Sequence, residues 1–205
     1  MALLKPHSLQ LPVAPEAIRA LKVGTPVLLS GRVHTGRDRF HKYVADGGPL
    51  PDGLKIEALF HCGPVVVGTA PDWRVCAAGP TTSIREEPYM ARVIERCGVR
   101  VIIGKGGMGP STQAACARFG AVYLQATGGA AQVLAQTIVA VYSVHFLERF
   151  GAAEAVWEFE VRNFPAVVTL DATGENLHAR IEASSRERLR ILREKPDDQG
   201  RGMSA

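Results

Sequence analysis

Short apolar runs alternate with amphipathic runs through the middle of the chain. Residues 86–98 carry apolar side chains at helical spacing and end on a glycine, which is suited to closing a helix. A buried strand, a helix that begins with proline and ends before glycine, and a second strand are predicted next, at 99–104, 110–120 and 121–126. Alternating strands and helices indicate a parallel α/β unit with right-handed crossovers.

The pattern changes towards the C-terminus. Residues 129–149 are mostly apolar and predict a long helix. Residues 158–174 predict two further strands, with a turn at Ala172-Thr173-Gly174. The last predicted helix, at about 176–195, is largely polar and basic.

The first half of the chain predicts shorter elements, separated by Gly/Pro turns and an irregular connection at 47–53. They are helices at 16–22 and 37–46, and strands at 27–33, 56–60, 64–68 and 73–79. The last three strands suit a small β layer. We therefore predict an α/β fold in which one domain covers 1–205, with its core at about 20–180, an N-terminal arm and a basic C-terminal helix.

Composition narrows the class of protein. Of 205 residues, 46% are hydrophobic and 21% charged, as in ordinary globular proteins. No apolar run has membrane-spanning length and the N-terminal segment is a poor signal peptide, so we expect a cytoplasmic protein with no membrane partner. The formal charge of +4 is modest and much of it lies in 180–195. A solvated amphipathic helix explains this charge as well as nucleic-acid binding would, and we expect no nucleic-acid partner.

The four cysteines, Cys62, Cys76, Cys97 and Cys116, contain no CxxC pair. A zinc or iron–sulfur site made by one chain normally includes a close pair. We therefore expect reduced thiols, and no metal or cofactor bound by this chain.

Three glycine-containing stretches carry the candidate chemistry, and they lie at 31–43, 78–89 and 104–109. Between them they offer the cations Arg37, Arg85 and Lys105 and the hydroxyls Thr81, Thr82 and Ser83. Glycines let a backbone come close to a small anion, and cations beside them favour a carboxylate. The set predicts a site that holds a carboxylic acid and moves a proton.

The stretch GKGGMG at 104–109 has three interpretations. Its glycines match the GxGxxG register of dinucleotide-binding turns, but no acidic residue follows between Glu95 and Glu148 to hold a ribose. It could serve only to reverse the chain. The third interpretation, which we favour, is an anion site at a helix N-terminus with Lys105 as a point charge.

The residues of GPTTSIR and of the first stretch could also have purely structural roles. Thr81 or its neighbours could simply cap a helix, whereas a hydroxyl beside fixed cations could act as an acid–base group. Arg37 and Asp38 could be a surface ion pair, and His34 and His41 could be ordinary half-exposed histidines.

Taken in order, the three stretches resemble the β subunit of iron–sulfur-dependent class I hydro-lyases, the two-subunit fumarases and L-tartrate dehydratases. Further similarity lies at 60–66 (FHCGPVV) and 155–177, so the resemblance covers roughly 20–180. This chain departs from the family at two places. It has Ile84-Arg85-Glu86 where the family often has Gly-Arg-Met, and it has Arg39-Phe40 where the family often has small residues. The rim of the pocket is therefore expected to differ.

The resemblance implies a swivelling β/β/α fold and a partner, an α subunit that carries a [4Fe–4S] cluster. Substrate, a small dicarboxylate, would bind between the two. It casts Arg37, Arg85 and Lys105 as carboxylate contacts and Thr81 as the base that removes the C3 proton. We predict Thr81, Arg85 and Lys105 as catalytic and Thr82 and Gly106 as further substrate contacts.

The sequence thus predicts half of a hydro-lyase that hydrates or dehydrates a C4 dicarboxylic acid within a homo- or hetero-oligomer. A non-catalytic module that binds a carboxylate or regulates a partner is the main alternative. A Rossmann-type oxidoreductase comes third.

Overall fold

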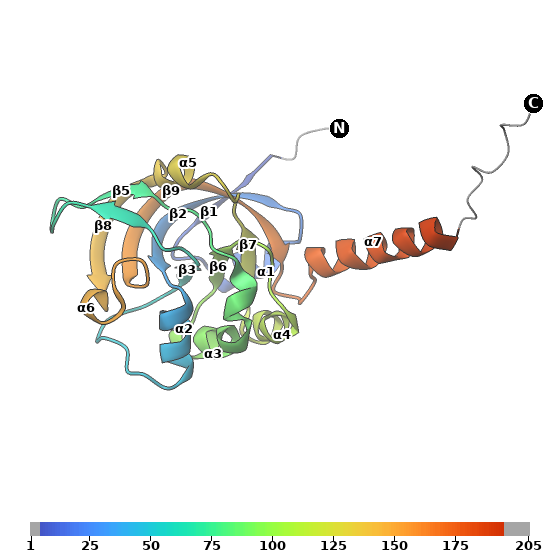
Figure 1. Cartoon of the computed structure of the whole chain (residues 1–205), viewed down its shortest axis with the longest axis horizontal. Helices are drawn as coiled ribbons and strands as arrows, with labels where there is room; N and C mark the ends of the chain where they lie inside the picture. The colour runs from blue at the N-terminus through green and yellow to red at the C-terminus, as the bar shows by residue number, and fades with distance from the viewer. Residues whose placement is uncertain (1–4, 195–205) are drawn as a thin grey trace, which may run out of the picture.

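The computed structural model describes residues 5–194 and is built around a closed ring of five strands (Figure 1). In order round the ring the strands are β2 (Pro26–Thr35), β3 (Ala58–Phe60), β6 (Val101–Gly104), β7 (Val122–Gln125) and β9 (Val156–Leu170). The first four pair in parallel, and β9 closes the ring because it pairs antiparallel with both β7 and β2. Strands β1 (His7–Gln10) and β8 (Ile138–His145) extend the sheet from β2 and β9.

Side chains of the parallel strands alternate between two cores, as the two-residue period of a strand requires. One core fills the ring, and it includes Phe60, Ile103 and Leu124. The other lies between the ring and the helices, and it includes Leu59, Ile102 and Tyr123. Because both faces of β3 and β6 are buried, these two strands are apolar throughout.

Three helices cover the outer face together: α2 (Asp38–Ala45), α3 (Glu87–Cys97) and α4 (Pro110–Phe119) (Figure 1). The predicted ends of α3 and α4 are confirmed, since Gly98 and Gly120 follow them with φ of 72° and 69°. Glycine adopts this left-handed conformation without a steric penalty.

The remaining short elements complete the body. They are α1 (Pro15–Ala20), a 3-10 turn η1 (Ser83–Glu86), α5 (Ala131–Ala135), α6 (Leu147–Phe150) and a hairpin of β4 (Val65–Val67) and β5 (Arg74–Ala77). The hairpin forms the small β layer that the sequence predicts. The predicted strand at 56–60 instead belongs to the ring, as β3.

Two predictions about the C-terminal half were wrong. The long helix expected at 129–149 is the short α5 followed by strand β8, whose β-branched residues Ile138, Val139 and Val141 favour a strand. The two strands expected within 158–174 are one continuous strand, β9, because pairing with three neighbouring strands carries it through Asn163 and Pro165.

The last helix, α7 (Leu177–Glu194), agrees with the prediction and extends away from the barrel (Figure 1). The end of the predicted helix at 195 lies outside the described residues. Within residues 5–194, no helix combines the length and apolar character that a membrane crossing requires. The mixed α/β architecture with a parallel portion is as predicted.

Candidate functional site

The candidate residues gather at the carboxyl edge of the barrel, which we define as the ends of β2, β3, β6 and β7. Arg37 follows the end of β2 by two residues, and Lys105 directly follows β6. His61 directly follows β3. Parallel strands point their carboxyl ends to one side, where open α/β sheets commonly bind ligands.

The turn that contains Thr81 and Thr82 crosses this edge. The Thr81 amide donates to the carbonyl of His61 at 2.7 Å, which fixes the turn to the end of β3. The Ser83 amide donates to the carbonyl of Lys105 at 2.9 Å, and the Lys105 amide donates to the carbonyl of Thr81 at 3.3 Å. The structure therefore brings Thr81, Thr82 and Lys105 together through backbone pairing.

Arg37 and Arg85 share one acid, although they come from different elements. Arg85 Nη2 donates to Asp38 Oδ2 at 3.1 Å, and Arg37 Nη2 lies 3.8 Å from the same oxygen. Arg37 Nε lies 3.4 Å from Glu154 Oε1. The predicted Arg37–Asp38 ion pair exists, but Asp38 also joins the two arginines at one place.

Thr81 does not cap a helix. Its hydroxyl donates to the His61 carbonyl at 3.0 Å, and the residue before η1 is Thr82, whose side chain makes no capping hydrogen bond. Thr82 is exposed, whereas Thr81 is half-buried. The hydroxyl of Thr81 is therefore held by the end of β3 and not by the turn that follows it.

Lys105 and Gly106 are placed differently from each other. The Gly106 amide already donates to Gln125 Oε1 at 3.0 Å, so it is engaged within the chain. The Lys105 side chain extends beside Gly128, where a methyl group in place of the glycine hydrogen would lie 3.9 Å from Nζ. Among residues 5–194, no acidic side chain lies within ion-pair distance of Lys105.

The anion site expected at the N-terminus of α4 is occupied by the chain itself. Glu87 accepts hydrogen bonds from the amides of Gly109 and Ser111, both at 2.8 Å, and from the Thr112 hydroxyl at 2.6 Å. A carboxylate satisfies these helix amides as a ligand would. The prediction of a ligand at this helix end was therefore wrong, and the same contacts leave no place there for a pyrophosphate.

A buried polar cluster lies beneath the carboxyl edge. Tyr123 OH donates to Ser83 Oγ at 2.9 Å, and Ser83 Oγ lies 2.8 Å from His61 Nδ1. Burial lowers the pKa of His61 well below its usual value, with nearby His41 and Arg85 adding to the effect. A Cβ at Gly104 would lie 1.9 Å from Ser83 Oγ, so only glycine leaves room for this cluster.

Glu86 and His41 form a second buried pair next to the arginines. His41 Nδ1 lies 2.8 Å from the Arg37 carbonyl and 3.5 Å from Glu86 Oε2. Burial lowers the pKa of His41 to about 4. Burial and nearby Asp38 raise the pKa of Glu86 to about 7, although Arg85 and Arg37 oppose this.

The possibility that His34 and His41 are half-exposed, which we favoured for His34, is wrong, because both side chains are buried. His41 belongs to the cluster just described, because its ring contacts that of His61 with centroids 4.8 Å apart. His34 lies one residue before the carboxyl end of β2, and its Nε2 is 4.0 Å from Glu158 Oε1. The sequence showed no signal for His61, Tyr123 or Glu86 as neighbours, since each reaches the cluster from a different element.

The thiols do not form a cluster site. Within residues 5–194, no three Cys, His, Asp or Glu side chains are arranged to hold a metal ion. Burial raises the pKa of Cys62 and Cys116 to about 12, which disfavours the thiolates that bind iron. The cysteines of this chain thus do not fit a [4Fe–4S] cluster.

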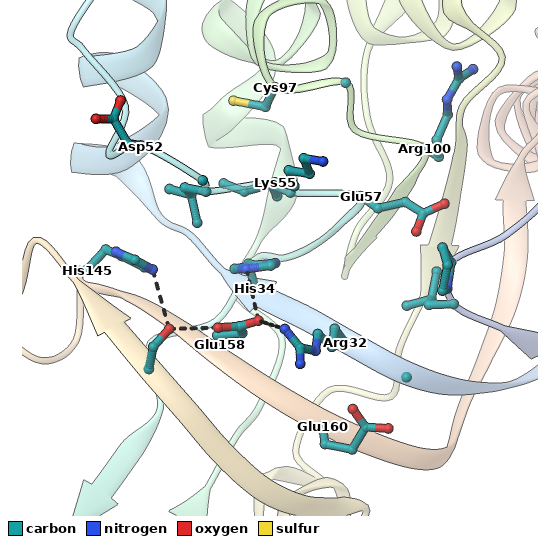
Figure 2. Close-up of a pocket in the computed structure, with 18 residues that line it drawn as sticks. Arg32, His34, Asp52, Lys55, Glu57, Cys97, Arg100, His145, Glu158 and Glu160 are labelled. Carbon is teal, nitrogen blue, oxygen red and sulfur yellow. Dashed lines mark hydrogen bonds and ion pairs between the residues drawn. The ribbon is translucent and has the colours of Figure 1, made fainter. Parts of the chain in front are cut away.

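A cavity of about 900 Å³ lies at the opposite, amino edge of the barrel (Figure 2). Glu57 and Arg100, which precede β3 and β6, line it together with residues of β2, β8 and β9. Arg32 and Glu158 form an ion pair of 2.9 Å in its wall (Figure 2). None of the predicted site residues lines this cavity.

The barrel gathers two arginines, a lysine and threonine hydroxyls at one edge, and cations of this kind are suited to carboxylates. The sequence matches the family described as Fumarase C-terminus over residues 5–181. This match covers most of the chain, which therefore belongs to that family.

Individual relatives agree with this assignment. The chain is 48% identical over 188 residues to a putative fumarate hydratase class I of Geobacillus stearothermophilus, covering 91% of this chain but 36% of that relative. It is 35% identical over 170 residues to the L(+)-tartrate dehydratase subunit beta of Escherichia coli K12, covering 82% and 84% of the two chains. A putative L(+)-tartrate dehydratase subunit beta of Methanocaldococcus jannaschii is 34% identical over 180 residues, covering 85% and 92%.

Proposed function

We propose that this chain is the β subunit of an iron–sulfur hydro-lyase that reversibly hydrates a C4 dicarboxylic acid, such as fumarate or tartrate. Its α partner would carry the [4Fe–4S] cluster, and the pair would work in the cytoplasm. The names of the relatives support the reaction class, and the β-subunit names support a separate partner.

One observation carries the proposal for the site. Arg37 and Arg85 come from different elements yet both contact Asp38, at 3.8 and 3.1 Å. Two guanidinium groups held at one point suit the two ends of a small dicarboxylate, because each can form a forked pair with a carboxylate. Substrate carboxylates would replace Asp38 as their partner.

The chemistry follows from this arrangement. Removing a proton next to a carboxylate creates an aci-carboxylate with extra negative charge on its oxygens. Guanidinium groups aimed at those oxygens stabilise the transition state more than the ground state. Lys105 would add a third positive charge. Thr81, held against the end of β3, would first lose its hydroxyl proton to solvent, which nearby cations favour, and its alkoxide would then take the C3 proton.

The other predicted contacts have smaller roles in this proposal. Thr82 is exposed beside Lys105 and is free to meet substrate at the rim. The Gly106 amide would contribute only after release from Gln125. We further propose that the chain acts as a swivelling part that closes on its partner over the carboxyl edge.

Co-expression of this chain with an iron–sulfur α subunit tests the proposal. The complex should hydrate fumarate or dehydrate tartrate, and a complex with Arg85→Ala should lose most of this activity while assembling normally. An assembled complex with an intact cluster that converts none of fumarate, malate and L-tartrate would contradict it. If the complex binds one of these acids without turning it over, the non-catalytic carboxylate-binding module becomes the better description.

A further inference from the structure

Glu86 is buried without a hydrogen-bond partner, directly behind the two arginines. Its side chain is fully buried, and neither carboxyl oxygen accepts a hydrogen bond within the described part of the chain. Buried carboxyls are normally paired, because desolvation strongly disfavours an unpaired charge. Neither the barrel core nor the proposed reaction accounts for this residue.

His41 does not provide a positive charge that would pair with an ionised Glu86. A backbone carbonyl can only accept, so His41 Nδ1, 2.8 Å from the Arg37 carbonyl, must carry hydrogen. The same Nδ1 lies 3.5 Å from Glu86 Oε2, which is a weak, bifurcated contact. Burial lowers the pKa of His41 to about 4, which keeps the ring neutral near pH 7.

The charges that act on Glu86 come from α2 and the residue before it, from η1, and from the segment before β9. Asp38 on α2 and Glu154 before β9 raise the pKa of Glu86, whereas Arg85 in η1 and Arg37 before α2 lower it. The same two acids contact the two arginines. The ionisation of Glu86 therefore depends on how much negative charge lies on the two arginines.

A dianion on Arg37 and Arg85 would change that balance. It would add negative charge beside Glu86 and offset the arginine charges that favour its ionised form. An ionised Glu86 would in turn compete with the dianion for the arginines.

We infer that Glu86 is a positioning residue of the site and takes up one proton from solvent when a dicarboxylate binds to Arg37 and Arg85. The inference rests on the proposed function only in the choice of ligand. Since binding and proton uptake are linked, ionisation of Glu86 weakens binding. The dissociation constant should rise by up to about tenfold per pH unit above about pH 7.

Calorimetry on the full chain tests this directly, with fumarate, L-malate and L-tartrate titrated in phosphate and in Tris buffer. The difference in heat between the buffers gives the number of protons taken up. We expect an uptake close to one proton at about pH 8 and close to none at about pH 6. Glu86→Gln, which removes the ionisation, should bind with no proton uptake and with little dependence on pH.

Two further variants control the experiment. Glu86→Met fills the same space without polar atoms, and it replaces Glu86→Gln if that variant folds poorly. It should likewise bind without proton uptake. Glu57→Gln removes an acid at the amino end of β3, where its Oε1 accepts from the Val13 amide, and should leave proton uptake unchanged.

The outcomes separate this inference from the proposed function. Binding without proton uptake, or equal uptake by wild type and Glu86→Gln, overturns the inference. If the chain alone binds none of the three acids, the same titrations are made on the complex with the α subunit, and no binding there overturns both proposals. Proton-linked binding by a complex that lacks hydro-lyase activity supports the inference and overturns only the catalytic proposal.

Discussion

The charged side chains at the two edges of the barrel differ in their partners. At the amino edge, which borders the cavity of Figure 2, Arg32 has its own acid, Glu158, at 2.9 Å, and Glu57 accepts from a backbone amide. At the carboxyl edge, Arg37 and Arg85 share Asp38, and Arg37 also lies 3.4 Å from Glu154. Lys105 has no acid within ion-pair distance among the described residues. We propose that these three cations, and not the size of a cavity, make the carboxyl edge the one suited to an acidic ligand.

Buried hydrogen bonds support the carboxyl edge from beneath. They join Ser83 of η1, His61 at the end of β3 and Tyr123 of β7. Such pre-organisation lets donors point at developing charge without rearranging during the reaction.

The largest effect is expected for Thr81→Val in the complex with the α subunit. If Thr81 is the base, kcat should fall by roughly 10²–10⁴ with little change in KM. The melting temperature should change little, because the His61 carbonyl keeps its bond from the Thr81 amide. Thr169→Val, which removes a buried hydroxyl that has no partner, is the matched control and should leave kcat intact. An unchanged kcat in Thr81→Val would remove Thr81 as the base.

A pair of arginine variants compares the two edges directly. Arg85→Lys keeps the charge but loses the forked geometry, so charge-assisted bonds worth about 1.5–3 kcal/mol are at stake. We expect KM to rise by about 10- to 100-fold. Arg32→Lys makes the same change at the amino edge and should alter KM by less than about twofold. Equal effects of both variants in steady-state kinetics would erase the distinction between the edges.

Gly104→Ala tests the buried cluster under the carboxyl edge. The new methyl would lie 1.9 Å from Ser83 Oγ and 2.9 Å from Tyr123 OH. Overpacking of this kind should lower the free energy of unfolding by about 1–3 kcal/mol, measured by denaturant titration. Ser83→Ala removes the nearest atom, so Gly104→Ala should cost less in that background than in wild type. Additive costs would argue against the predicted clash.

The last prediction concerns how the free energy of unfolding depends on pH. The pKa of Glu86 is raised from 4.5 to about 7, so between these values the folded chain binds more protons than the unfolded chain. The free energy of unfolding contributed by Glu86 therefore falls as pH rises through this window. Relative to Glu86→Gln, wild type should lose roughly 3 kcal/mol between about pH 4 and about pH 8. Parallel pH profiles of the two proteins in urea titrations would refute the assignment.

Local signals predicted much of the fold. Prolines and glycines defined α3 and α4, and apolar runs located β6 and β7, because each of these elements is specified by its own residues. β8 was mistaken for part of a helix because its apolar residues follow directly on α5. β9 was divided in two because its continuity depends on pairing with strands far away in the sequence.

The same contrast applies to the site. The motifs predict Arg37, Thr81, Arg85 and Lys105 as site residues, since glycines and cations stand next to each other in the sequence, and their roles stay a prediction. They could not reveal that Glu87 occupies the N-terminus of α4, because 22 positions separate Glu87 from the Gly109 amide that it binds. The buried cluster likewise depends on topology, since Ser83 and Tyr123 lie 40 positions apart.

A crystal structure of this chain with its iron–sulfur partner and a bound dicarboxylate tests the central claim most directly. The account predicts that the carboxylates of the ligand contact Arg37 and Arg85 at the carboxyl edge, with Asp38 displaced from at least one of them. A dicarboxylate bound instead in the amino-edge cavity beside Arg32 and His34, with the Asp38 contacts intact, would contradict it.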